Sequence, residues 1–272
     1  MMMMFPILIA WLFFQSFSSP TPPGDLSGNP DPVTGNPIFV AHRGASYLAP
    51  ENTLASIRLA WELGADAAEC DVMLTSDHRL ILFHDKNTRS LTGENFVVSE
   101  TPWEKLSQLT IRLKDSNRSK YAQERIPLLS EILETIPADR MLVIEIKTEQ
   151  EILPFLKQVI DAHWNSGRIS FICFDLETIL ATKRVFPEQP CYFLSSLRSG
   201  VIRHFDEILR GSLDGVNVRH KAVNKNLVQR CRAQGLEVWC WTVNKPEDAR
   251  KMKALGVSAI TTDRPKWLKE QI

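Results

Sequence analysis

Short apolar runs alternate with amphipathic stretches from residue 37 to the end of the chain, and this alternation restricts the fold more than any other feature. Short apolar runs are typical of buried strands, and longer stretches with a helical spacing of apolar residues are typical of helices. Repeated strand–helix units predict a parallel sheet, and eight such units close into a (β/α)8 TIM barrel. The predicted strands are residues 38–42, 67–75, 80–84, 141–147, 169–174, 191–195, 215–218, 237–243 and 259–262, with helices at 52–63, 152–164, 178–186, 224–233 and 246–255.

The nine predicted strands are one more than this barrel needs. Only four residues separate the second strand from the third, which is too few for a helical crossover and suits an antiparallel hairpin. A turn centred between Asp77 and His78 would place Asp71 opposite His84. The polar residues 86–125 that follow are expected to form an irregular excursion over the mouth of the barrel.

Two segments precede the predicted barrel domain of residues 37–272. Residues 1–18 contain an apolar core at 5–14 that is too short for a bilayer of about 30 Å, so we expect a signal peptide and an exported protein. The start of the leader lacks Lys and Arg, which leaves an uncleaved membrane anchor or a mis-assigned start as alternatives. Residues 19–36 are rich in Pro, Gly, Asn and Asp and predict a flexible linker.

The composition argues against nucleic acid as a partner and predicts the state of the cysteines. The 32 basic residues balance the 32 acidic residues, so the chain has no net charge to attract nucleic acid. The five cysteines form no C-x-x-C pair, and four of them lie in apolar strand-like runs. We expect them to be buried free thiols, which behave as small apolar side chains.

Charged and polar side chains mark the ends of several predicted strands. Active sites of such barrels form at the carboxyl ends of the strands. Charged groups in otherwise apolar strands are costly unless they are paired or coordinated. In chain order these residues are His42, Arg43, Glu69, Asp71, His84, Asp85, Glu145, Lys147 and Trp241.

Three carboxylates among these residues predict a metal site. Glu69 and Asp71 are two residues apart, so both point to one face of their strand, and Glu145 occupies the same kind of position on the next strand. Converging carboxylates repel one another unless a cation lies among them, and oxygen ligands favour Mg²⁺ or Ca²⁺ over zinc. The alternative is a structural ion-pair network of the carboxylates with Arg43 and Lys147.

The remaining residues at the strand ends predict acid–base chemistry on a phosphate. His42 and His84, beside the carboxylates, can divide the roles of general base and general acid. Arg43 and Lys147, together with a cation, would make a pocket suited to a phosphoryl group. Trp241 would form a wall of this pocket, although a core position explains a tryptophan there as well.

The chain from residue 39 to residue 267 resembles the glycerophosphodiester phosphodiesterase family. Eight short motifs occur in the family's order and at compatible spacing. One such motif would be weak support, but eight in order are specific. They are Ala-His-Arg-Gly at 41–44, Pro-Glu-Asn-Thr at 50–53, Glu-Cys-Asp-Val at 69–72, Leu-Thr-x-Asp at 74–77, His-Asp at 84–85, Glu-Ile-Lys at 145–147, Trp-Thr-Val-Asn at 241–244 and Thr-Asp-Arg-Pro at 262–265.

The resemblance implies a barrel enzyme that hydrolyses glycerophosphodiesters to glycerol 3-phosphate and an alcohol, with one divalent cation, Ca²⁺ or Mg²⁺. Carried over by motif, it assigns the acid–base pair to the two histidines, the cation to the three carboxylates, and phosphate contacts to Arg43 and Lys147. It also makes Glu51 and Asn52 supporting residues, although a helix N-cap explains Asn52 equally well.

Two other functions remain open at this point. A lysophospholipase D or sphingomyelinase D-like enzyme would share the barrel and the cation but would act on lipids, with transient contact to its lipid substrate. Residues 86–125 are mostly polar, which favours a soluble substrate slightly. A non-catalytic exported binding protein on the same barrel would be expected to lack some of the predicted site residues. The oligomeric state is not determined by the sequence.

Overall fold

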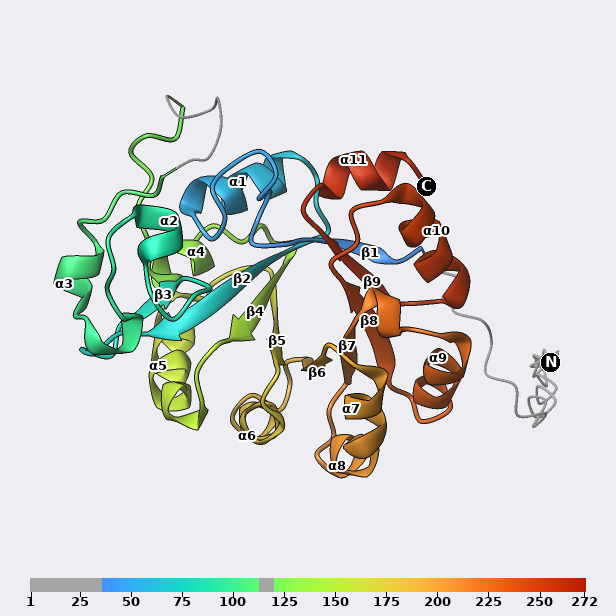
Figure 1. Cartoon of the computed structure of the whole chain (residues 1–272). Coiled ribbons are helices and arrows are strands. Elements are labelled where there is room, and N and C mark those ends of the chain that lie inside the picture. The colour runs from blue at the N-terminus through green and yellow to red at the C-terminus, as the bar shows by residue number, and fades with distance from the viewer. Residues whose placement is uncertain (1–35, 113–119) are drawn as a thin grey trace, which may run out of the picture. The chain divides into compact units, whose positions relative to one another are not determined.

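Eight parallel strands close into a ring in the computed structural model, which describes residues 36–112 and 120–272 (Figure 1). The ring runs β1-β2-β4-β5-β6-β7-β8-β9, and it closes because β1 pairs with both β2 and β9. The predicted (β/α)8 barrel is therefore confirmed. The strands are β1 Ile38–Ala41, β2 Ala67–Leu74, β4 Met141–Ile146, β5 Arg168–Cys173, β6 Cys191–Ser195, β7 Gly215–Arg219, β8 Glu237–Trp241 and β9 Ala259–Thr262.

The ninth strand, β3 (Leu80–Leu82), pairs antiparallel with the end of β2, as predicted. The predicted register is wrong by one residue, because Val72 lies opposite Leu82, and Phe83, not His84, takes the position opposite Asp71. The physical reason is the turn. Thr75 and Arg79 close it, and three residues between them form the loop, with His78 at a positive φ of 60°.

Helices fill the connections between barrel strands and lie outside the ring. They are α1 Leu54–Glu62, α4 Leu129–Leu133, α5 Leu153–His163, α6 Leu176–Val185, α7 Arg198–Arg203, α8 Phe205–Arg210, α9 Lys225–Arg232, α10 Pro246–Leu255 and α11 Pro265–Glu270. Side chains of Thr53, Asp175 and Asn224 cap α1, α6 and α9 by accepting a bond from a backbone N–H in the first turn. All five predicted helices are present, with ends shifted by at most two residues.

Alternation along the strands divides the apolar side chains into two cores. An inner core inside the ring contains Val40, Ala67, Val143 and Trp239, among others. A larger outer core lies between the ring and the helices, and Cys70 belongs to it. All five cysteines are buried and free, as predicted. Because the inner core fills the lower part of the ring, polar residues that point inward near the carboxyl ends of the strands face the mouth.

The excursion after β3 includes two short helices, α2 (Arg89–Thr92) and α3 (Trp103–Leu106). Its apolar residues Val98, Leu106 and Ile111 pack with Ile81 of β3 in a third, small core. The excursion therefore packs against the hairpin at one side of the barrel. In the described part of the chain, no helix is both long enough and apolar enough to cross a membrane. The predicted leader and nearly all of the predicted linker lie outside the described residues.

Candidate active site at the carboxyl ends of the strands

The predicted site residues gather at one end of the barrel. A pocket of about 240 Å³ opens there, lined by residues within or just after all eight barrel strands. Asp71, Glu51 and Asn52 do not line the pocket, but each contacts Arg43, which does. The residues predicted from the sequence that line the pocket are His42, Arg43, Glu69, His84, Glu145, Lys147 and Trp241.

Three carboxylates crowd together at this pocket, with Glu69 and Glu145 in its lining and Asp71 beside them. One oxygen from each of Glu69, Asp71 and Glu145 lies within 4.8 Å of the others. Glu69 and Asp71 are only 2% and 1% exposed. Burial, together with the negative charge of Asp71, raises the pKa of Glu69 to about 8. Burial and Asp71 also raise the pKa of Glu145. The ionised carboxylates therefore repel one another strongly, as expected for like charges in a buried site.

The loop between β1 and α1 places Arg43 against this cluster. Its backbone N–H donates to Glu69 Oε2 (2.8 Å), and its Nε lies 3.1 Å from Asp71 Oδ2. Its Nη1 donates to Glu51 Oε1 (2.7 Å), so Glu51 holds the guanidinium from the other side. Arg43 has a positive φ of 53°, and Gly44 follows at 77°, where a Cβ would lie 2.5 Å from the Ser56 backbone. This sharp, tightly packed turn aims the guanidinium inward.

Asn52 holds Asp71 through both ends of its amide. Its Nδ2 donates to Asp71 Oδ2 (2.8 Å), and its Oδ1 accepts from the backbone N–H of Asp71 (3.0 Å). Asn52 also has a positive φ of 55°. The N-cap of α1 is Thr53, so the alternative explanation of Asn52 as a helix cap is wrong. Its side chain orients a site carboxylate.

Lys147 lies on the opposite side of the cluster. Its Nζ donates to Glu145 Oε1 (2.6 Å) and lies 3.5 Å from Asp71 Oδ1. Burial lowers the pKa of Lys147, but the charges of Glu145 and Asp71 outweigh this effect, and the pKa is raised. Lys147 therefore stays protonated and compensates part of the negative charge.

The alternative of a closed ion-pair network does not account for all the charges. Arg43 and Lys147 face the carboxylates of Asp71, Glu145 and Glu51, so one negative charge remains in excess even while Glu69 is protonated. Glu69 Oε1 and Asp71 Oδ1 are buried and accept no hydrogen bond within the described residues. Buried oxygens without donors are costly, and oxygen ligands of this kind are those that hard divalent cations prefer. The residues therefore fit a cation among them.

Each of the two histidines is bonded to a carboxylate through Nδ1. His42 Nδ1 donates to Asp263 Oδ1 (2.7 Å), and His84 Nδ1 donates to Asp85 Oδ1 (2.8 Å). Burial lowers the pKa of His42, but the bond to Asp263 and the charge of Glu69 outweigh burial and raise it. Hydrogen bonds from Ser90 and His84 lower the pKa of Asp85, which keeps this carboxylate ionised. In both pairs Nε2 is the nitrogen left free for proton exchange.

Sequence reasoning assigned no role to the two carboxylates that orient these histidines. Asp263 belongs to the Thr-Asp-Arg-Pro motif at 262–265, but it lies more than 200 residues from His42, and no local pattern links them. Asn244 and Ser46 also donate to Asp263 and fix its position. Asp85 follows His84 directly, and this adjacency was a usable signal.

An aromatic pair forms another part of the pocket wall. The Phe174 and Trp241 rings meet edge to face with centroids 5.6 Å apart, and Trp241 Nε1 donates to the carbonyl of Asn217 (3.2 Å). Phe174 is 44% exposed and was not predicted as a site residue. Trp241 lines the pocket and also packs, partly buried, against the inner core, so both interpretations of this residue hold.

Comparison with known proteins now decides the family. The model of the glycerophosphoryl diester phosphodiesterase family matches residues 42–267, which is most of the chain. The chain belongs to this family. It is 32% identical over 237 residues to a glycerophosphodiester phosphodiesterase of Caldanaerobacter subterraneus, with 85% of the chain and 96% of that relative covered. The family makes it a phosphoric diester hydrolase that acts on glycerophosphodiesters.

Two further relatives bear on the substrate. The solved structure of an Oleispira antarctica phosphodiesterase in complex with sn-glycerol-3-phosphate is 28% identical, with a TM-score of 0.79 and coverage of 87% of this chain and 96% of that one. A lysophospholipase D of Rattus norvegicus is 26% identical, with 85% of this chain and 84% of that protein covered. The family therefore includes relatives named for two substrate classes.

The contact between Asp263 and His42 predicts how His42 titrates. Replacing the carboxylate, in Asp263→Asn, should lower the pKa of His42, because its negative charge and its charge-assisted hydrogen bond stabilise the protonated imidazole. Titration of the His42 ring signals by NMR in cation-free protein measures this. Asp248→Asn, an equivalent change 3.8 Å from His220, is the control and should leave the titration of His42 unchanged. An unshifted His42 in Asp263→Asn would contradict the orienting role.

Proposed function

We propose that this phosphodiesterase converts glycerophosphodiesters to glycerol 3-phosphate and an alcohol, with His42 and His84 as the acid–base pair. The observation that carries the proposal is the arrangement of two carboxylate-bonded imidazoles in a pocket that two carboxylates of the cluster line and the third, Asp71, adjoins. One imidazole, through its free Nε2, takes a proton from the attacking group, which is water or a hydroxyl of the substrate. The other gives a proton to the oxygen of the leaving alcohol.

Glu69, Asp71 and Glu145 would hold one divalent cation, Ca²⁺ or Mg²⁺. Their crowding and the two buried oxygens without donors support this part of the proposal. A bound cation would polarise the phosphoryl oxygens and offset negative charge in the transition state. Asn52 keeps Asp71 in position, so it contributes by orienting a ligand and not by contact with the substrate.

Arg43 and Lys147 would bind the phosphate oxygens. Both line the pocket, and both stay protonated, because the neighbouring carboxylates raise the pKa of each against the lowering effect of burial. Glu51 holds the guanidinium, which keeps the Arg43 donors in place before substrate arrives. Trp241 and Phe174 would border the organic part of the substrate with an apolar surface.

The acid–base role predicts a large loss of turnover on removal of one imidazole. His84→Ala should lower kcat on glycerophosphocholine by at least about 10², because one proton transfer loses its catalyst. His163→Ala, which removes an imidazole bonded to a carboxylate far from the pocket, is the matched control and should turn over normally. Steady-state release of choline measures both. Normal turnover by His84→Ala would exclude the role.

The cation requirement is tested first by removal and add-back. EDTA should abolish glycerophosphocholine hydrolysis, and restoration by Ca²⁺ or Mg²⁺ identifies the ion. Glu69→Gln should weaken cation binding in calorimetry, because the amide lacks the charge of the ligand. Glu188→Gln, which replaces an exposed carboxylate, serves as the control. Hydrolysis that persists in EDTA, or unchanged binding by Glu69→Gln, would remove the cation or this ligand from the proposal.

The raised pKa of Glu69 gives cation binding a direction with pH. In the cation-free protein this carboxyl is protonated below about pH 8, so a cation must displace a proton to bind there. Affinity should therefore rise with pH up to about 8 in wild type. The same calorimetry at several pH values measures this slope, and Glu69→Gln should lose the part of it that comes from Glu69.

We also propose that the protein is exported and that residues 1–18 are removed as a signal peptide. The apolar core at 5–14 and the small residues that follow it support this. Expression of the full chain in a secreting host, followed by mass spectrometry of the exported protein, should give a mature N-terminus near residue 19. Retention in the membrane with the leader intact would support the anchor instead.

A further inference from the structure

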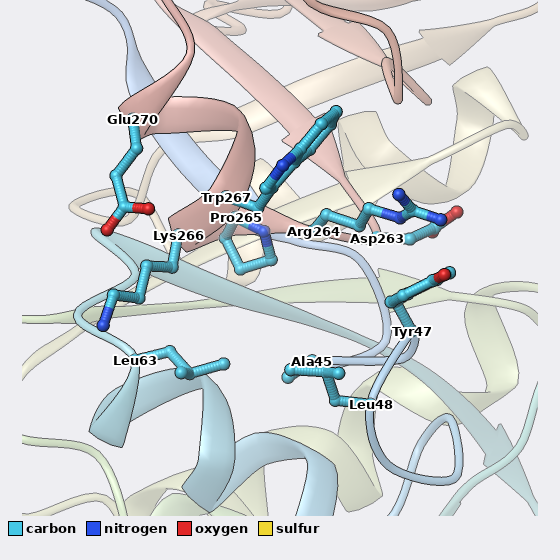
Figure 2. A pocket seen from close by; sticks show the side chains of 10 residues that line it. All are labelled: Ala45, Tyr47, Leu48, Leu63, Asp263, Arg264, Pro265, Lys266, Trp267 and Glu270. Atoms are coloured by element: carbon cyan, nitrogen blue, oxygen red, sulfur yellow. The ribbon is translucent and has the colours of Figure 1, made fainter.

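An apolar cleft of about 280 Å³ lies outside the catalytic pocket, beside the last helix (Figure 2). The β1–α1 loop and the end of α1 form one side, with Ala45, Leu48 and Leu63. Pro265 and Trp267 of α11 form the other side. This volume is close to the lower end of the range of about 300–1,000 Å³ for small-molecule sites, so the cleft has room for a short hydrocarbon segment.

The cleft gathers exposed apolar side chains. Tyr47, Leu48 and Trp267 are 59%, 45% and 40% exposed, and they are three of the seven large apolar side chains that are exposed in the described part of the chain. Isolated exposed apolar residues are normal, but their gathering in one hollow indicates a binding surface. The cleft is concave, and a concave site suits an inserted hydrocarbon chain better than it suits a flat partner surface.

The cleft adjoins the catalytic pocket through a single pair of side chains. Asp263 lines the cleft, and its Oδ1 accepts the bond from His42, which lines the catalytic pocket. The cleft is therefore adjacent to the catalytic pocket, because a residue that lines one contacts a residue that lines the other.

Arg264 stands at the end of the cleft nearest to Asp263 (Figure 2). Its guanidinium lies 3.4 Å from the centroid of the Tyr47 ring and 5.3 Å from that of Trp267. No carboxylate lies within ion-pair distance of it among residues 36–112 and 120–272, whereas Asp263 is occupied by His42, Asn244 and Ser46. The guanidinium thus offers donors to ester oxygens that enter from the catalytic side.

We propose that this cleft binds the acyl chain of a lysophospholipid whose phosphodiester lies in the catalytic pocket, with Arg264 at the ester. This inference rests on the proposed function of that pocket. The oxygen of water bonds to phosphorus, the bond from phosphorus to the head-group alcohol oxygen breaks, and this oxygen takes up a proton. Lysophosphatidylcholine and water thus give lysophosphatidate and choline, with the acyl ester intact.

The test is the dependence of kcat/KM on chain length. Hexanoyl, octanoyl and decanoyl lysophosphatidylcholine are compared with glycerophosphocholine, all below their micellar concentrations. Each methylene that enters the cleft should raise kcat/KM by up to about fourfold, the ratio that follows from burial of one CH₂ group. In the double variant Leu48→Gln/Trp267→Gln this rise should flatten, because amides replace the apolar walls.

A matched control separates the cleft from exposed apolar surface in general. Leu197→Gln/Ile202→Gln also replaces two exposed apolar side chains, but these lie at the start of α7 and within it, and not in the cleft. This variant should keep the wild-type rise of kcat/KM with chain length. Circular dichroism and thermal melting of both double variants report on folding. An unchanged rise in Leu48→Gln/Trp267→Gln, or no rise in wild type, overturns the proposal.

The outcomes also distinguish this inference from the proposed function. If wild type fails to hydrolyse glycerophosphocholine, the proposed function itself is wrong. If it hydrolyses glycerophosphocholine without a chain-length effect, only the acyl site is wrong. Light scattering gives the third outcome: loss of a dimer in Leu48→Gln/Trp267→Gln with the rise intact would assign the cleft to a second copy of the chain and overturn the proposal.

Discussion

Repulsion among three buried carboxylates is the constraint on which the site is built. Asp71 is 1% exposed, and one of its oxygens lies within 4.8 Å of oxygens of Glu69 and Glu145, so its burial depends on two segments that supply partners for it. The β1–α1 loop supplies Arg43 and Asn52, and the end of β4 supplies Lys147. The positive φ values of Arg43 and Asn52 are the local cost of this arrangement. Even so, negative charge and two buried oxygens without donors remain, which is the condition for binding a cation.

Each of the two histidines beside this cluster is oriented by a carboxylate hydrogen-bonded to Nδ1. The two carboxylates lie at very different sequence separations from their histidines. His84 uses its neighbour Asp85, so a two-residue unit carries its own orientation. His42 uses Asp263, at the far end of the chain, and therefore depends on closure of the barrel between β1 and β9. The first pair is a local property of the excursion, and the second exists only when the whole ring has formed.

The Asp263–His42 contact also joins two surfaces of different character. On one side lies a polar pocket suited to phosphate, and on the other an apolar cleft with exposed Tyr47, Leu48 and Trp267. Under the proposal made for the cleft, one scaffold acts on diesters with and without a hydrocarbon chain. The polar excursion suggested a soluble substrate, but the apolar surface lies elsewhere, on α11 and the β1–α1 loop. It was invisible in the sequence because its residues come from segments about 200 positions apart.

The sequence by itself determined the order of strands and helices, the closed barrel, the antiparallel hairpin and the inward alternation of Glu69 and Asp71, because apolar periodicity and strand pleat are local properties. It also placed the polar residues at the correct end, since all parallel strands of a barrel end on one side. The hairpin register was decided by the backbone of His78, whose left-handed conformation no composition rule supplies. Only the tertiary structure brought Asp263 to His42, turned Asn52 to Asp71 and assembled the cleft, because each of these contacts joins side chains that are not neighbours in the sequence, from 19 positions apart for Asn52 and Asp71 to 221 for His42 and Asp263.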